Sequence, residues 1–219
     1  MGKVSRARDG SAFETWAPGE DAGRFLARLN EDWIKSARRM SPRLLTDLLE
    51  FMAGPLSEYF AALDPLALGD RVSWAGPSPA PVWLDTAREY MERWIHQQHI
   101  RDATVRAGQT EPQFVHPVLA ASMHALPPAM EKHGSSPGAL VVAIGGPAGG
   151  SWSVVHADQR WQLFEGTADD PRASVRVAAE DWWRLVTLGL RPEDVRLRAA
   201  VEGDDALVRA ALSAIAIIA

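Results

Sequence analysis

The stretch PVWLDTAREYMERWIHQQHIRDA, residues 81–103, decides the fold, because it predicts one long helix with two distinct faces. At 100° per residue one arc is apolar and an adjacent stripe is polar. The apolar arc contains Leu84, Ala87, Met91, Trp94 and Ile95, with Trp83 and Tyr90 at its edge. The polar stripe contains Asp85, Arg88, Glu92, His96 and His99. One face of this helix is therefore expected in a core, and the other can carry chemistry.

Glu92 and His96 are the candidate metal ligands on that polar stripe. They are four residues apart, so their Cβ atoms lie roughly 6 Å from each other on one helix face. Both side chains can then reach one ion at about 2.0–2.2 Å. His99 lies about 10.5 Å along the axis from Glu92 at ~1.5 Å per residue, which makes it a poor ligand for the same ion. The alternative is an ordinary surface pair, because catalytic zinc takes three protein ligands.

Residues 74–103, WAGPSPAPVWLDTAREYMERWIHQQHIRDA, resemble the last bundle helix of the mycothiol-dependent maleylpyruvate isomerase family, with its Pro-rich lead-in. That family is a branch of the DinB-like metal-binding four-helix bundles. Its last bundle helix supplies a Glu and a His four apart, which fall here on Glu92 and His96. AIGGPAGGSWSV, RWQLFEG and VEGDDALVRAAL are similar to its C-terminal α+β domain, which resembles sterol-carrier proteins. The resemblance covers the chain from about Ser5 to Ala219.

The resemblance implies a divalent metal, most simply zinc, and mycothiol as a borrowed thiol acting on a small electrophilic acid. One departure stands out. The family's third ligand is a His on an earlier helix, whereas His96 is the first of the six histidines here. The resemblance implies that this chain begins where that helix should be ending. We expect a shortened form, a site completed by another residue such as His99 or a partner subunit's His, or an inactive site.

Composition narrows the function classes. With 219 residues, 47% hydrophobic content and nine tryptophans, the chain can build a core. Its net charge of −5 argues against a nucleic acid or an anionic membrane as the main partner. The absence of cysteine excludes disulfides and a protein-borne thiol nucleophile, so thiol chemistry would need a borrowed thiol. No secretory signal or apolar run of membrane-spanning length is visible, and we expect a soluble cytoplasmic protein.

The chain divides into four predicted segments. A polar arm covers residues 1–20. An incomplete DinB-like four-helix bundle covers residues 21–104, with helices over 24–40, 42–63 and 81–103, the second kinked or broken at Gly54-Pro55. A connecting segment, residues 105–138, contains a helix from Pro117. Residues 139–219 form the sterol-carrier-like α+β domain.

From Ala139 the hydrophobic period changes to that of strands. LVVAIGG and SWSVVHA flank GPAGG, which predicts a hairpin, and RWQLFEG, ASVRVAA and RLRAAVEG predict three more strands. EDWWRLVTLGL and DDALVRAALSAI predict helices with acidic first turns. Grouped strands with two helices on an antiparallel sheet indicate an α+β fold. Trp182 and Trp183 could line a ligand pocket, although adjacent aromatics usually place one ring in the core and one at its edge.

Two functions stay open at this point. The first is a metal-dependent enzyme of the maleylpyruvate isomerase type, in which Arg191, Arg196 or Arg198 could clamp a substrate carboxylate or could be solvated surface charges. The second is a non-catalytic protein that binds a metal or a small apolar ligand. In either case an incomplete bundle leaves Trp33, Phe51 and Trp94 uncovered, so we expect a homodimer.

Overall fold

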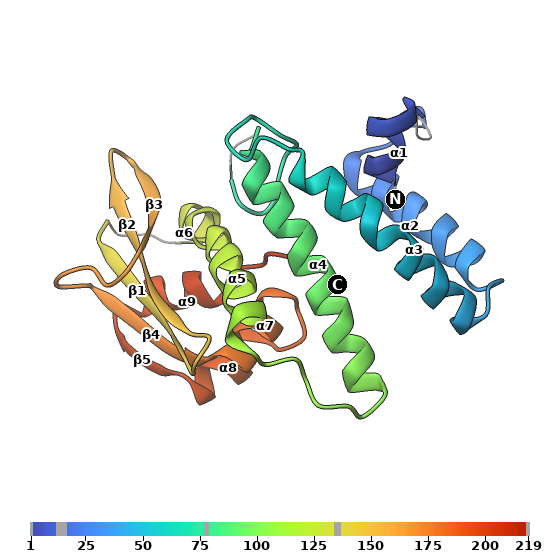
Figure 1. Cartoon of the computed structure of the whole chain (residues 1–219). Helices are drawn as coiled ribbons and strands as arrows, with labels where there is room; N and C mark the ends of the chain where they lie inside the picture. Colours follow the sequence, from blue (N-terminus) through green and yellow to red (C-terminus); the bar gives the residue numbers. More distant parts are fainter. Residues whose placement is uncertain (1, 12–16, 77–78, 134–136, 218–219) are drawn as a thin grey trace. The chain divides into compact units, whose positions relative to one another are not determined.

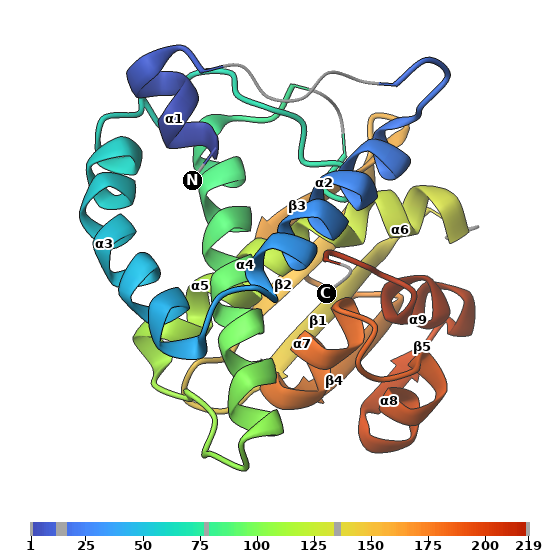
Figure 2. The same ribbon diagram turned by 90° about the vertical axis from the view of Figure 1, so that its right-hand side faces the viewer.

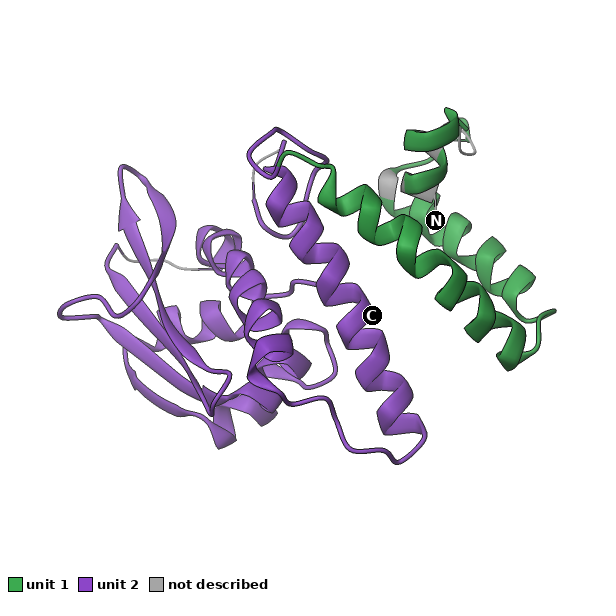
Figure 3. Cartoon of the chain, in the orientation of Figure 1, with its two compact units in different colours: residues 1–64 green, residues 65–219 purple. Residues whose placement is uncertain are grey.

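The computed structural model describes residues 2–11, 17–76, 79–133 and 137–217. Its chain forms two compact units, Met1–Asp64 and Pro65–Ala219, which Figure 3 distinguishes by colour. Helices fill the first part of the chain and a mixed five-stranded sheet follows, so the predicted α+β class is confirmed. Within the described residues, none of the helices combines the length and apolarity needed to cross a membrane.

The described residues of the first unit form three helices, α1 (Gly2–Asp9), α2 (Ala22–Ala37) and α3 (Pro42–Ala61). Local caps fix two of their starts. Asp21 accepts the backbone N–H of Arg24, and Ser41 accepts that of Leu44 with a proline at the first helical position. α3 continues through Pro55 as one helix, so a break there is excluded. α1 falls in the predicted polar arm, of which residues 12–16 lie outside the described chain.

The first helix of the second unit is the long helix predicted at residues 81–103, which the structure places at α4 (Val82–Ala103). Its other helical segments are α5 (Pro112–Ser122), η1 (Met123–Ala125), α6 (Leu126–His133), α7 (Ala179–Val186), α8 (Pro192–Arg198) and α9 (Asp205–Leu212). The connecting helix therefore starts five residues before the predicted Pro117, because Pro112 occupies a favoured first-turn position. α4 belongs to the same compact unit as the sheet.

The sheet has the strand order β3-β2-β1-β4-β5. Its strands are β1 (Ala139–Gly145), β2 (Gly150–Ala157), β3 (Arg160–Glu165), β4 (Ala173–Ala178) and β5 (Ala200–Gly203). The β1–β2 hairpin around GPAGG is confirmed. The expected antiparallel sheet is wrong at one place, because β1 and β4 pair in parallel. The connection of residues 166–172 causes this, since it returns the chain to the end of the sheet where β1 starts.

Two further sequence expectations need correction in this region. The fifth strand was predicted from residue 196, but residues 196–198 belong to α8 and β5 starts at Ala200. Pro192 at the first position and two acids in the first turn favour that helix. Trp94 was expected to be uncovered, yet only 5% of it is exposed. It packs against Trp183, a residue far along the sequence.

The core of the second unit lies between one face of the sheet and the helices that cover it (Figures 1 and 2). Alternate residues of β1 point into this core, and Leu140, Val142 and Ile144 are buried. The apolar arc of α4 is buried as predicted at Leu84, Met91 and Ile95, and Trp94 is buried with it. The same arc also buries one polar side chain, Gln98, which matters for the site described next.

Candidate functional site

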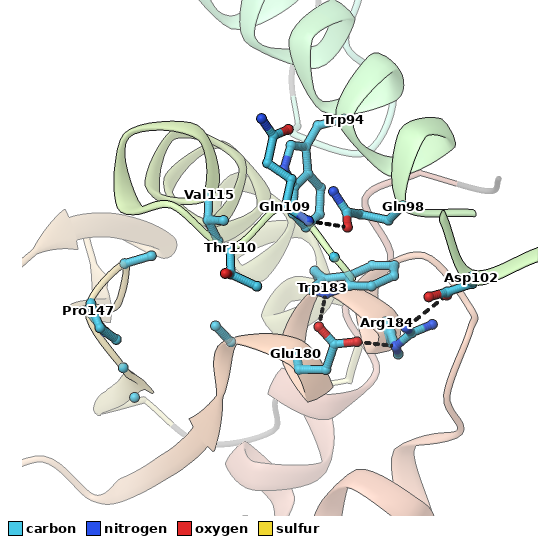
Figure 4. A pocket seen from close by; sticks show the side chains of 15 residues that line it. Trp94, Gln98, Asp102, Gln109, Thr110, Val115, Pro147, Glu180, Trp183 and Arg184 are labelled. Atoms are coloured by element: carbon cyan, nitrogen blue, oxygen red, sulfur yellow. Dashed lines mark hydrogen bonds and ion pairs between the residues drawn. The ribbon is translucent and has the colours of Figure 1, made fainter. Parts of the chain in front are cut away.

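A cavity of about 400 Å³ lies within the second unit (Figure 4). Its walls come from one face of α4, the segment 108–110, Val115 of α5, the β1–β2 turn and the start of α7. Elements far apart in the sequence thus meet around one space. We call it the tryptophan cavity, after the two indole rings that line it.

Trp94 and Trp183 form the apolar wall of the tryptophan cavity. Their ring centroids are 5.4 Å apart and their planes are nearly perpendicular, at 89°. This edge-to-face arrangement is a favourable one for aromatic pairs. The guanidinium of Arg184 lies 4.3 Å from the centroid of the Trp183 ring, in a cation–π contact. The Trp183 ring therefore contacts both the Trp94 ring and the Arg184 guanidinium.

An ion network fixes the polar side of the cavity. Arg184 donates to Asp102 at 2.9 Å and to Glu180 at 2.7 Å, and Glu180 also accepts the indole N–H of Trp183 at 2.8 Å. Burial disfavours the charge of Arg184, but the hydrogen bonds to Glu180 and Asp102 outweigh it and raise the pKa of the guanidinium. Arg184 thus stays cationic and links the end of α4 to α7.

Two side chains of the cavity wall each have a buried N–H donor that lacks a partner. Nε1 of Trp94 and Nε2 of Gln98 find no hydrogen-bond acceptor within the described part of the chain, and both side chains are at most 5% exposed. The other amide atom of Gln98, Oε1, accepts the backbone N–H of Gln109 at 3.0 Å. Gln98 is therefore oriented through its oxygen while its NH₂ group remains unused. Each of these two nitrogen atoms exposes less than 1 Å² of surface, so neither faces the open space, and each is a local cost to stability.

The β1–β2 turn forms the opposite wall and is held in place. His116 Nδ1 lies 3.0 Å from the carbonyl oxygen of Ala148, which can only accept, and its ring stacks on Trp152 at 6.0 Å. A Cβ atom added at Gly149 would lie 2.0 Å from the carbonyl oxygen of Ile144, so no other residue fits there without a shift of the backbone. The turn thus presents a fixed edge to the cavity.

Glu92 and His96 come together as their spacing predicts. Glu92 Oε2 and His96 Nε2 are 3.6 Å apart, a separation that suits two ligands of one ion. Burial raises the pKa of Glu92, against the influence of Arg88 and His96. Across residues 2–11, 17–76, 79–133 and 137–217, no group of three or more His, Cys, Asp or Glu side chains could hold a metal ion. The donor set fits a metal as a pair, and metal binding there stays a prediction.

The Glu92–His96 pair and the tryptophan cavity use different faces of α4. Trp94, Gln98 and Asp102 follow one another at intervals of four and line the cavity, whereas Glu92 and His96 do not. His96 has 59% of its side chain exposed. His99 packs its ring 6.4 Å from that of Trp183 and 6.0 Å from that of His96. The candidate metal pair is therefore separate from the cavity.

The other residues singled out in the sequence have mixed outcomes. Trp182 is fully buried and donates to Ser122 at 2.8 Å, whereas Trp183 lines the cavity. The three candidate carboxylate clamps each bind an acid of the chain and do not line the cavity; they are Arg191 with Asp194, Arg196 with Asp205 and Arg198 with Asp181. The arginine at the cavity is Arg184, which sequence reasoning did not select.

Gln98 was also missed, although a signal for it exists. It follows Trp94 by four residues and Met91 by seven, so it lies on the apolar arc of the helix. A polar residue on a buried arc is informative because it needs a reason to be there. Arg184 offers no comparable signal, because its place depends on how α7 meets α4.

Comparisons with known proteins give structural similarity only. No protein-family model matches the sequence, and no curated protein matches it significantly. Three similar solved structures are sterol carrier protein domains. The sterol carrier protein domain 2 of Helicoverpa armigera has a TM-score of 0.36 and 18% identity over 48% of this chain and 88% of its own. The sterol carrier protein 2 like 2 of Aedes aegypti has a TM-score of 0.31 and 18% identity over 41% of this chain and 92% of its own.

The third is the apo sterol carrier protein 2 of Yarrowia lipolytica, with a TM-score of 0.32 and 12% identity over 61% of this chain and 85% of its own. Each of these proteins belongs to the type that the sequence resemblance named for residues 139–219. All three TM-scores lie below 0.5, and the α+β fold of this chain rests on its own strand order and pairing.

Proposed function

We propose that this protein binds a small, mainly apolar molecule in the tryptophan cavity. The observation that carries the proposal is a space of about 400 Å³ that is walled by two tryptophans and lined on its polar side by Asp102, Glu180 and Arg184. Ligand sites are commonly concave spaces of roughly 300–1,000 Å³ with apolar walls and a few placed polar groups. The cavity combines all three properties.

The walls of the cavity are also preformed. Arg184 ties α7 to α4 through Asp102, and His116 holds the β1–β2 turn at Ala148. A preorganised site loses little conformational entropy when a ligand enters, which favours affinity. The site therefore needs no rearrangement of α7 or of the turn to accept a molecule of two fused rings.

A titration with naphthalene tests the proposal. We expect saturable binding, followed by isothermal calorimetry and by the indole N–H signals of the protein. Thr110→Trp should fill the cavity, which Thr110 lines, and weaken binding at least about tenfold. Thr167→Trp is the matched control, because Thr167 is exposed and does not line the cavity. Absence of saturable binding to the unmodified protein would refute the proposal.

A second candidate function is favoured by the Glu92–His96 distance of 3.6 Å. Here Glu92 and His96 would hold a divalent metal, zinc most simply, and a metal at this place lowers the pKa of a coordinated thiol. The chain has no cysteine, so the thiol would be a borrowed one such as mycothiol. Because the described residues supply two ligands, we expect weak or absent turnover of a maleylpyruvate-like acid.

Elemental analysis of protein purified without chelator tests this second candidate. It should give near-stoichiometric zinc, and His96→Ala should abolish it. His99→Ala is the control, and it should keep the metal because His99 is not expected to share the ion with Glu92. Unmodified protein that stays metal-free after zinc addition would rule out the site.

A further inference from the structure

β3 is an edge strand whose outward backbone groups are partly unused. It stands at one end of the strand order, so β2 is its one strand partner in the described chain. Gly166 donates to the carbonyl of Ser151, and in an antiparallel pair every second residue bonds in the same direction. The alternate residues Trp161, Leu163 and Glu165 therefore direct their N–H and C=O groups outward, away from β2.

One of these three outward positions is already capped. Trp161 donates its backbone N–H to Oε1 of Glu131, in α6, at 2.9 Å. For the backbone N–H groups of Leu163 and Glu165, no acceptor is found across residues 2–11, 17–76, 79–133 and 137–217. Leu163 is half-buried and Glu165 is exposed. Unpaired edge groups of this kind are a template for another strand.

Two further cavities of the second unit lie along β3. One of about 720 Å³ lies between the start of β3 and α6, and one of about 280 Å³ lies between the end of β3, α4 and α5. His124 and Leu163 line both cavities, so the two adjoin. We call them together the edge groove. None of its lining residues lines the tryptophan cavity.

The edge groove suits alternate side chains of an added strand. A residue placed opposite Leu163 or Glu165 projects its side chain to the same face of the sheet as theirs. This is the core face, because Val154, the β2 partner of Leu163, is fully buried there. The smaller cavity offers apolar walls on that face, among them Trp152. On the opposite face an added strand would cover Phe164, whose side chain is 50% exposed.

The charge of the larger cavity favours an acidic occupant. Lys132 and Arg160 line it, and neither forms an ion pair with another described residue. Glu131, the acid beside them, already accepts the N–H of Trp161. Two cations against one acid give this cavity a net charge of +1. A carboxylate placed opposite Trp161 would therefore be attracted.

We infer that the edge groove binds an extended, acidic peptide segment of a partner protein, which adds to β3 as an antiparallel strand, the more stable pairing. The segment would exchange up to about four backbone hydrogen bonds, shared between Leu163 and Glu165. In this direction, apolar side chains opposite Glu165 and Leu163 come first along the peptide, and an acid opposite Trp161 follows. The inference goes beyond the proposed function, because it concerns a different surface and a different class of partner.

A titration of the unmodified protein with one peptide tests the inference. The probe is the acetylated and amidated peptide TLTLTET, whose leucines and glutamate occupy alternate positions. We expect saturable binding, in which the amide signals of Leu163 and Glu165 move downfield and gain protection from hydrogen exchange. The amides of Gln162 and Phe164 are the internal control, because they already bond to β2 and should keep their protection.

Methylated peptides separate strand addition from binding through side chains alone. Methyl groups on the two leucine nitrogens block the N–H donors that face β3, and they should weaken binding about tenfold or more. Methyl groups on the nitrogens of the two threonines that follow the leucines face away from β3. This matched peptide should bind within about twofold of the unmethylated one.

A protein variant tests the charge. Arg160→Gln should weaken binding of TLTLTET about two- to fivefold, as expected for an exposed ion pair. It should leave binding of TLTLTQT, in which glutamine replaces the acid, unchanged. Arg176→Gln is the matched control, because Arg176 is exposed on β4 and does not line the edge groove. The control should leave the binding of both peptides unchanged.

Several results would overturn the inference. Absence of saturable binding, or equal binding of the two methylated peptides, would show that no strand adds to β3. An equal loss for TLTLTET and TLTLTQT with Arg160→Gln would contradict the preference for an acid. Protection of the Leu163 and Glu165 amides that rises with protein concentration, without peptide, would assign the edge to a second copy of this chain. None of these results bears on naphthalene in the tryptophan cavity, so the two proposals can fail independently.

Discussion

The two compact units differ in how their apolar residues are used. Among the described residues of the first unit, Val4 is the one hydrophobic side chain in the buried class, and α3 buries none. In the second unit a continuous core joins α4 to the sheet and to α9. Trp33 and Phe51 of the first unit are 53% and 73% exposed, whereas Trp182 of the second is 0% exposed.

This difference shows which interactions specify the structure of each unit. In the first unit, α2 and α3 begin at side-chain caps, Asp21 and Ser41, which are signals local in sequence. The second unit depends on contacts between distant residues, such as Trp94 with Trp183. Substitutions should therefore have large effects on stability in the second unit and small ones in the first.

The largest effect is expected for Trp182→Ala. Its fully buried ring would leave a large cavity in the core, which typically costs about 3–5 kcal/mol of unfolding free energy. Phe51→Ala in α3 is the counterpart and should change stability by less than about 0.5 kcal/mol, because its ring is exposed. Urea denaturation followed by fluorescence measures both. Similar losses for the two variants would contradict the comparison.

A smaller effect is expected for Ser122→Ala. Ser122 Oγ accepts the indole N–H of Trp182 at 2.8 Å, and its removal leaves that buried N–H unpaired, at a cost of about 1–3 kcal/mol. Thr46 of α3 also makes a hydrogen bond, to the carbonyl of Pro42 at 2.9 Å, but it is exposed. Thr46→Ala should therefore stay within about 0.5 kcal/mol in the same denaturation experiment. A larger loss for Thr46→Ala would show that burial does not determine how much stability a lost hydrogen bond costs.

The expected homodimer stays a prediction, and the exposed apolar side chains of the first unit are the place to test it. Six of the large hydrophobic residues in its described part are more than a third exposed, namely Leu26, Trp33, Ile34, Leu44, Leu49 and Phe51. If a second copy covers this surface, Phe51→Glu should weaken dimerisation about tenfold or more. Light scattering across micromolar concentrations measures the shift. Unmodified protein that is monomeric under these conditions would contradict the expected homodimer.

The smallest effect belongs to the surface of the second unit, at Glu92. Burial raises the pKa of this carboxyl above its ordinary value of 4.5, so the folded chain binds the proton more tightly than the unfolded chain does. The associated stability is present below the unfolded pKa and is lost as the pH rises through the folded pKa. At pH 7 Glu92→Gln should stabilise the metal-free protein, within about 0.5 kcal/mol.

Denaturation in the presence of a chelator checks this expectation. The gain from Glu92→Gln should vanish near pH 3, where the carboxyl of the unmodified protein is itself protonated. The matched variant Glu111→Gln, at an exposed position before α5, controls for the loss of one surface charge. A gain that is the same at both pH values would assign the effect to something other than the proton on Glu92.

The sequence predicts the helices and strands of this chain better than it predicts which of them pair or pack together. The cap at Ser41, the long helix α4 and the GPAGG hairpin all follow from short patterns, and the structure contains them. α8 was missed because the alternation in RLRAAVEG favours a strand, although Pro192 already offers a helix start. The parallel pairing of β1 with β4 has no local signature, since β1 is an apolar run and β4 alternates, and neither pattern specifies the direction of the neighbouring strand.

The same distinction applies to the candidate sites: a pair close in sequence could be predicted, whereas a cavity built from distant residues could not. Glu92 and His96 could be paired from their spacing alone, because a helix fixes the geometry of residues four apart. The tryptophan cavity could not be found from sequence, because it forms only where α4, the β1–β2 turn and α7 meet. Its ion network joins Asp102 to Arg184, which are 82 residues apart in the sequence. No periodic pattern of the sequence relates residues that far apart.

The position of β1 in the sheet has a consequence for the order of folding. β1, β2 and β3 follow one another along the chain and can pair through short turns, so this three-stranded meander needs little loop closure. β4 must instead dock beside β1 from the far end of the 166–172 connection, and β5 can add only after it. Pairings of greater sequence separation form more slowly. In a refolding experiment with pulsed hydrogen exchange, the amides of β2 should gain protection before those of β5.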